Sequence, residues 1–137
     1  MKFLVTILIG AMLLVSSRIT AQKQTITATV ANVTSDKGTV MFALYDKTNF
    51  RMKPLQSENG KIEGRKTTVV FKDVTPGEYA IVCYHDSNGN EKMDFQSNGM
   101  PLEDFGASNN FMAFAPPTFE NAKFVVANKN VTLDIRF

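Results

Sequence analysis

Short stretches in which apolar and polar residues alternate, separated by turn residues, constrain the fold of this chain most strongly. Residues 24–30, QTITATV, place Ile26, Ala28 and Val30 on one face and threonines on the other, which is the period of a half-buried strand. The final run, VTLDIRF (131–137), repeats this alternation, and after residue 22 no segment longer than ten residues has a clean helical period. The pattern predicts an all-β fold: an antiparallel β-sandwich of about seven strands, immunoglobulin-like or transthyretin-like.

Turn residues between the alternating runs predict which strands are neighbours. Residues 35–38, Ser-Asp-Lys-Gly, separate the first run from residues 39–46, TVMFALYD, and predict a β-hairpin. Residues 39–46 are apolar on both faces, which is typical of a central strand. Residues 75–77, Thr-Pro-Gly, combine a proline that presets φ with a glycine that accepts positive φ. We therefore expect residues 67–74 and 75–86 to form a second tightly connected pair.

Two further stretches complete the expected chain path. Residues 46–66 are polar and irregular, with Pro54, Gly60 and Gly64 as breakers, and are predicted to form a loop with at most one short helical turn. The stretch FVVAN leads through an Asn-Lys-Asn turn into the final run. The last strand is therefore expected to be half buried, with the chain ending inside the sheet.

The N-terminus has the pattern of a secretory signal peptide. Lys2 precedes an apolar run from residue 3 to residue 15, and small or polar residues then lead to Ala21. The apolar run is shorter than the roughly 20 residues that a bilayer span needs, which argues against an uncleaved anchor. We expect residues 1–21 to be removed and residues 22–137 to form one exported domain, periplasmic or extracellular, with no membrane span.

Charge and cysteine content exclude several classes of function. Removal of Lys2 and Arg18 with the signal peptide leaves 13 basic and 13 acidic residues, so the net charge falls from +2 to zero. No Lys/Arg cluster is interleaved with aromatic residues, so nucleic acid is not an expected partner. The single cysteine, Cys83, cannot form an internal disulfide. Its neighbours Ile81 and Val82 favour a buried thiol over an intermolecular bridge.

The stretch YHDSNGNEKMDF, residues 84–95, carries the candidate site. Oxygen-bearing groups fall at alternating positions when Asp86 is counted as position 1, the spacing with which a calcium loop surrounds its ion. Position 6, usually glycine, is Glu91, and position 12, usually a bidentate glutamate, is Ser97. The predicted ligands of Ca²⁺ are Asp86, Asn88, Asn90, the Lys92 carbonyl and Asp94.

Two interpretations of this loop stay open. Because only two of the ligands are carboxylates, a calcium site here would be weak, with Kd roughly 10⁻⁴ to 10⁻³ M. The same residues also suit a plain polar turn, since Asp and Asn bond to the backbone nearby and tolerate the left-handed region. The preceding strand excludes an ordinary helix-loop-helix calcium hand.

A long Phe-rich segment without a strand period follows, residues 95–120. Loops of this length are usually functional or packed down as lids. Glu103 and Asp104 could add a carboxylate to the metal loop, and Asn109 and Asn110 offer amides that could hold the segment's backbone. Four aromatic side chains are expected to pack over one open end of the sandwich or, alternatively, to build a ligand groove: Phe105, Phe111, Phe114 and Phe119.

Three motifs lie in the second half of the chain: YHDSNGNEKMDF, NGMPLEDFGASNN and FAPPTFENAKF. Together they resemble the secreted bacterial family known as domain of unknown function 2141, whose members carry a similar His-Asp-x-Asx-x-Asn loop and a Pro-x-Glu-x-Phe-Gly-x-Ser-Asn-Asn segment. The resemblance covers essentially the whole chain after the signal peptide. It implies a small exported β-sandwich and the location of its site, but no particular activity. Glu91 departs from the glycine expected in the family loop.

These features favour an exported binding or structural module over an enzyme. In this interpretation calcium pins the long segment to the strand end and fixes a surface for an envelope protein or a polysaccharide. One alternative is a small hydrolase-like enzyme that uses His85 and nearby carboxylates, although one His and one Cys are too few for a usual zinc site. The other is a carbohydrate-binding module, which needs exposed flat aromatics in a chain that has no Trp.

Overall fold

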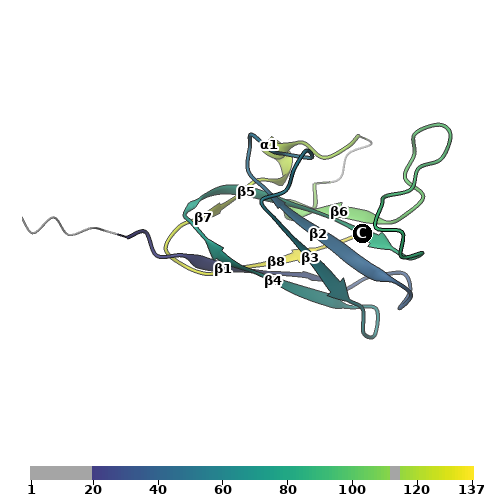
Figure 1. Ribbon diagram of the computed structural model, residues 1–137, viewed down its shortest axis with the longest axis horizontal. Helices are drawn as coiled ribbons and strands as arrows, with labels where there is room; N and C mark the ends of the chain where they lie inside the picture. Colours follow the sequence, from purple (N-terminus) through teal and green to yellow (C-terminus); the bar gives the residue numbers. More distant parts are fainter. Residues whose placement is uncertain (1–19, 112–114) are drawn as a thin grey trace, which may run out of the picture.

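A computed structural model describes residues 20–111 and 115–137, and these form two facing β-sheets (Figure 1). One sheet has the strand order β4-β1-β8, and the other has the order β3-β2-β5-β6 with β7 paired to β5. The predicted all-β sandwich is confirmed. Its elements are β1 (Gln24–Val30), β2 (Thr39–Tyr45), β3 (Gln56–Lys61), β4 (Thr67–Val74), β5 (Gly77–Asp86), β6 (Phe105–Ala107), the 3₁₀ turn η1 (Ser108–Asn110), α1 (Phe119–Ala122), β7 (Phe124–Val126) and β8 (Val131–Ile135).

The core lies between the two sheets and is built from the alternating faces that the sequence indicates. Ile26, Ala28 and Val30 of β1 are fully buried, and Phe42 of β2 and Phe71 of β4 join them from opposite sheets. Burial of one such phenylalanine side chain stabilises the fold by about 1.5–3 kcal/mol. Strand period and core face are therefore confirmed for these strands.

Both predicted strand pairings at the turns are wrong. β1 pairs with β4 and β8, whereas β2 pairs with β3 and β5, so residues 35–38 cross from one sheet to the other. Residues 75–77 likewise connect β4 in one sheet to β5 in the other. A turn that connects two sheets and a hairpin within one sheet both place the apolar faces of their strands toward the same core. The alternation pattern and the turn residues therefore cannot distinguish these two connections.

Two other expectations about the strands need correction. Residues 56–61, expected within a loop, form β3, a polar edge strand paired only with β2 among the described strands. β8 pairs in parallel with β1, while the other five ladders between named strands of the described ranges are antiparallel. β8 is half buried as expected but lies at the edge of its sheet rather than inside it.

The long segment after β5 is held down by side chains of η1. Asn109 Nδ2 donates to the carbonyl oxygens of Asn121 (3.2 Å) and Lys123 (2.6 Å). Asn110 Nδ2 donates to Asp134 O (2.8 Å), and Asn110 Oδ1 accepts from Arg136 N (2.8 Å), so this amide covers the free edge of β8. Both asparagines bond to the backbone as expected, but their partners belong to residues that follow the segment rather than to the segment itself.

The phenylalanines of this segment divide between packing and exposure. Phe119 is buried and packs edge-to-face on Phe50, with ring centroids 5.8 Å apart. Phe105 and Phe111 are exposed, so the packing alternative is wrong for these two residues. They line a hollow of about 550 Å³ with Pro116, Pro117 and Phe137, which corresponds to the groove alternative, while a ligand for it stays a prediction. Phe114 lies outside the described residues.

The N-terminal prediction lies mostly outside the described part of the chain. Residues 1–19, which include most of the expected signal peptide, are not among the residues described. Within residues 20–111 and 115–137, no helix is long and apolar enough to cross a membrane.

Candidate functional site

The candidate loop begins where β5 ends, with a buried carboxylate. Asp86 is 1% exposed, and its two oxygens accept hydrogen bonds from the backbone N–H groups of Asn90 (3.2 Å) and Glu91 (2.8 Å). Gly38 lies directly against this point with φ +71°, and a Cβ there would overlap Asp86 O. Position 38 therefore requires glycine, and the residue 35–38 crossover packs directly against the backbone where the loop begins.

The middle of the loop is a network of amide and carboxylate groups. Asn88 Nδ2 donates to Asp94 Oδ2 (2.8 Å), and Asn90 Nδ2 lies 2.9 Å from both Asp94 oxygens. The amide oxygens turn to the backbone instead, where Asn88 accepts from Asn90 N (3.2 Å) and Asn90 accepts from Lys92 N (3.0 Å). The structure thus brings Asp86, Asn88, Asn90 and Asp94 into one loop, as the spacing predicts.

Glu91 takes the left-handed conformation expected of glycine at position 6. Its φ is +59°, which costs a residue with a Cβ roughly 1–2 kcal/mol. The hydrogen bond from its N–H to the buried Asp86 carboxylate helps to hold this turn. The departure from glycine therefore does not abolish the sharp turn.

A small hairpin interrupts the loop before position 12. Phe95 and Pro101 form a β-bridge, Gln96 N donates to Met100 O (2.7 Å), and Leu102 N donates to Asp94 O (2.8 Å). Ser97 is therefore carried away at the tip of this hairpin. Figure 1 shows the segment as green loops beyond the ends of β5 and β6.

The hairpin returns the chain with Glu103 beside the candidate loop. Glu103 Oε2 accepts from Asp94 N (3.3 Å), whereas Glu103 Oε1 is buried and has no hydrogen-bond partner. The residue is only 9% exposed. Asp104 points elsewhere, because its Oδ2 accepts from Thr34 Oγ1 (2.8 Å). Of the two further carboxylates in this segment, only Glu103 reaches the loop.

Negative charge concentrates around Tyr84. Burial raises the pKa of this tyrosine above its ordinary value, and the neighbouring Asp86, Glu103, Glu91 and Asp94 raise it further. Four negatively charged carboxylates thus disfavour ionisation of the Tyr84 phenol, and a bound cation would offset their negative charge.

The loop supplies oxygen donors to a cation, but not as a preformed carboxylate cluster. In the described ranges, no three His, Cys, Asp or Glu side chains form a group that could hold a metal ion. Two of the predicted ligands are asparagines and one is the Lys92 carbonyl, which are ligands that Ca²⁺ accepts. The donor set fits a hard cation, although the amide nitrogens of Asn88 and Asn90 face Asp94.

His85 and Cys83, the His and Cys considered for catalysis, are both buried. His85 is 3% exposed; its Nε2 donates to Lys37 O (2.6 Å), and its Nδ1 lies 3.5 Å from Thr34 Oγ1. Cys83 is fully buried, as predicted, and burial raises its thiol pKa far above the ordinary value. The partners Thr34 and Lys37 are far from His85 in sequence, and no motif signals these contacts.

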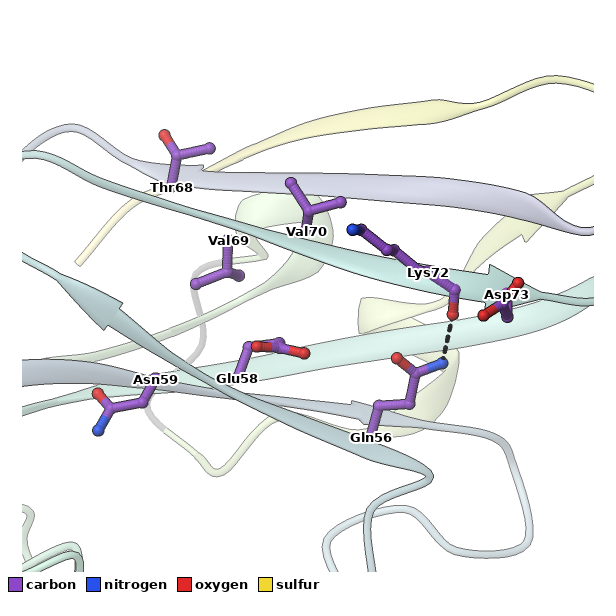
Figure 2. A pocket seen from close by; sticks show the side chains of 8 residues that line it. All are labelled: Gln56, Glu58, Asn59, Thr68, Val69, Val70, Lys72 and Asp73. Carbon is purple, nitrogen blue, oxygen red and sulfur yellow. Dashed lines mark hydrogen bonds between the residues drawn. The ribbon is translucent and has the colours of Figure 1, made fainter.

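A separate hollow lies between the edge strands β3 and β4 (Figure 2). Gln56 Nε2 reaches across it and donates to Lys72 O (2.8 Å). Glu58, Lys72 and Asp73 give its walls mixed charge, and none of the predicted site residues lines it. This contact ties the two sheet edges together.

Fold and loop together define a class: a small all-β sandwich with an acidic, asparagine-rich loop at the end of its longest strand. The chain belongs to the bacterial family DUF2141, described as "Uncharacterized protein conserved in bacteria", whose model matches residues 28–134. The family resemblance seen in the motifs is thereby confirmed, while secretion stays a prediction. No curated protein and no solved structure matches the chain.

Proposed function

We propose that this chain is an exported, non-catalytic β-sandwich module, binding or structural, with a weak calcium site in the loop from Asp86 to Asp94. The observation that carries the proposal is the meeting of a buried Asp86 carboxylate with Asp94 and two asparagine side chains in one turn of calcium-loop spacing. Asp86, Asn88, Asn90, the Lys92 carbonyl and Asp94 are the proposed ligands.

Calcium would act mechanically in this module. Asp86 ends β5, while Asp94 bonds to Leu102 and Glu103 at the return of the hairpin. A cation held by both aspartates joins the sheet to the segment that leads into β6. It thereby orders a surface for a partner, which we propose to be an envelope protein or a polysaccharide.

The contacts of His85 and Cys83 support a non-catalytic module. A general base must reach a proton on its substrate, but His85 is buried and its Nε2 proton is committed to Lys37 O. A nucleophilic cysteine needs an accessible thiolate, and burial raises the pKa of Cys83. His85 therefore ties β5 to the residue 35–38 crossover through Lys37 O, and Cys83 packs in the core with its thiol 3.7 Å from Gly106 O of β6.

The test is the melting temperature of residues 22–137, a piece that contains all the strands described for both sheets. Calcium at ten times Kd should add about 1.4 kcal/mol relative to excess EDTA, a rise of several degrees. Asp94→Asn should abolish the rise. Asp73→Asn is the matched control, because Asp73 is exposed in β4 and its φ of +59° suits asparagine.

Two outcomes would contradict the proposal. No rise at tens of millimolar calcium would make the loop a polar turn without a metal. Loss of a hydrolytic activity on His85→Ala, with melting temperature unchanged, would favour the enzyme alternative.

A further inference from the structure

The loop lacks a ligand where a complete calcium loop has its strongest one. The bidentate glutamate of position 12 normally closes the coordination sphere, and here position 12 is Ser97, at the exposed tip of the hairpin. The same hairpin returns Glu103 to a point where its carboxylate contacts Asp94 N at 3.3 Å. A glutamate from outside the loop thus lies next to position 9.

The environment of Glu103 is unusual for a residue without a ligand. The residue is about nine-tenths buried, and Oε1 is buried and has no hydrogen-bond partner. Burial of an unpaired carboxylate oxygen is unfavourable because its hydration is lost without replacement. Asp86 and Asp94 lie in the same loop and carry the same sign of charge. An unpartnered oxygen in an acidic site points to a cation as its partner.

We propose that Glu103 is a ligand of a divalent cation, calcium, and supplies from outside the loop the carboxylate missing at position 12. This inference deepens the proposed function and rests on it. Glu103 raises the number of proposed carboxylate ligands from two to three, with Asp86 and Asp94. Because the described residues contain no preformed group of three such side chains, the cation has to draw these three carboxylates together. Because Glu103 follows the hairpin of residues 95–101, cation binding locks this hairpin onto the end of β5.

The experiment measures calcium affinity by isothermal titration on residues 22–137. Glu103→Gln should raise Kd at least tenfold, which corresponds to about 1.4 kcal/mol. Glu91→Gln is the matched control: it removes the same charge from an exposed side chain of the candidate loop itself and should change Kd less than threefold. In excess EDTA, Glu103→Gln should melt no lower than the wild-type protein, since the amide is neutral and keeps an acceptor oxygen.

The possible results distinguish a failure of Glu103 as a ligand from the absence of any calcium site in the loop. If Glu103→Gln binds calcium within threefold of wild type while Asp94→Asn does not bind, the loop site stands and Glu103 is not a ligand. If the wild-type protein binds no calcium, the proposed function fails as well.

A measurement on the unmutated chain covers the case in which Glu103→Gln fails to fold. The carboxyl ¹³C resonance of Glu103 should shift on addition of calcium, whereas that of Glu91 should not. An unshifted Glu103 resonance at saturating calcium would overturn the inference.

Discussion

Replacement of Ser108 by alanine removes a hydroxyl that continues the β5–β6 ladder after β6 ends. The last ladder pair is Val82 with Ala107, and the next backbone donor of β5, Ile81 N, is bound by Ser108 Oγ at 3.0 Å. The same hydroxyl donates to Ala122 O in α1. One buried side chain therefore joins β5, η1 and α1.

The cost of this substitution follows from the burial of the groups it leaves behind. Ile81 is fully buried and Ala122 is 1% exposed, so water does not readily replace the lost contacts. A buried polar group left without a partner costs about 1–3 kcal/mol. With two such groups and partial relaxation, we expect Ser108→Ala to lower the free energy of unfolding by about 2–4 kcal/mol. For a domain of this size that is a fall in Tm of about 8–16 °C.

Thermal unfolding followed by circular dichroism measures this change. Ser97→Ala is the matched control, since Ser97 is exposed at the tip of the hairpin and should change Tm by less than about 2 °C. A fall for Ser108→Ala no larger than that of Ser97→Ala would refute the reasoning, because it would mean that other groups satisfy Ile81 N and Ala122 O.

Three further predictions follow from buried contacts. Gly106→Ala should lower the free energy of unfolding by about 1–3 kcal/mol, seen as a lower urea midpoint, because its Cβ would lie 2.5 Å from Arg136 O; an unchanged midpoint would show that the backbone at Arg136 moves to make room. Cys83 should react with thiol reagents only at the rate of unfolding, since burial also raises its pKa, and rapid labelling in native buffer would contradict this. Tyr79→Phe should cost about 0.5–1.5 kcal/mol in a thermal melt, because it removes the 2.7 Å hydrogen bond to Thr75 O; an unchanged Tm would show that this bond contributes nothing.

Strand period was predictable, but strand partners were not. The alternation in residues 24–30 arises because one face of the strand contacts the core and the other contacts water. This pattern is visible within the strand's own seven residues. The crossover at residues 35–38 and the arch at 75–77 depend on which sheet the next strand joins. β3 escaped prediction because QSENGK packs little of its surface into the core, and its pairing with β2 is made by backbone groups.

The candidate site divides in the same way. Asp86, Asn88, Asn90 and Asp94 lie within nine consecutive positions, so their spacing alone indicates one polar loop. Glu103 carried no signal that would separate it from Asp104, its equally acidic neighbour. The hairpin sets the direction of the chain on its return, and it turns Glu103 to Asp94 and Asp104 to Thr34.

The β class, the core faces of the strands, the buried thiol of Cys83 and the composition of the acidic loop could be inferred from the amino-acid pattern alone, because each depends on residues close together in the chain. The tertiary structure decided the two-sheet topology, the parallel β1–β8 pair, the burial of His85 against Lys37 and the position of Glu103. These features join residues far apart in sequence, and they depend on how the whole chain fills one core and satisfies its backbone hydrogen bonds.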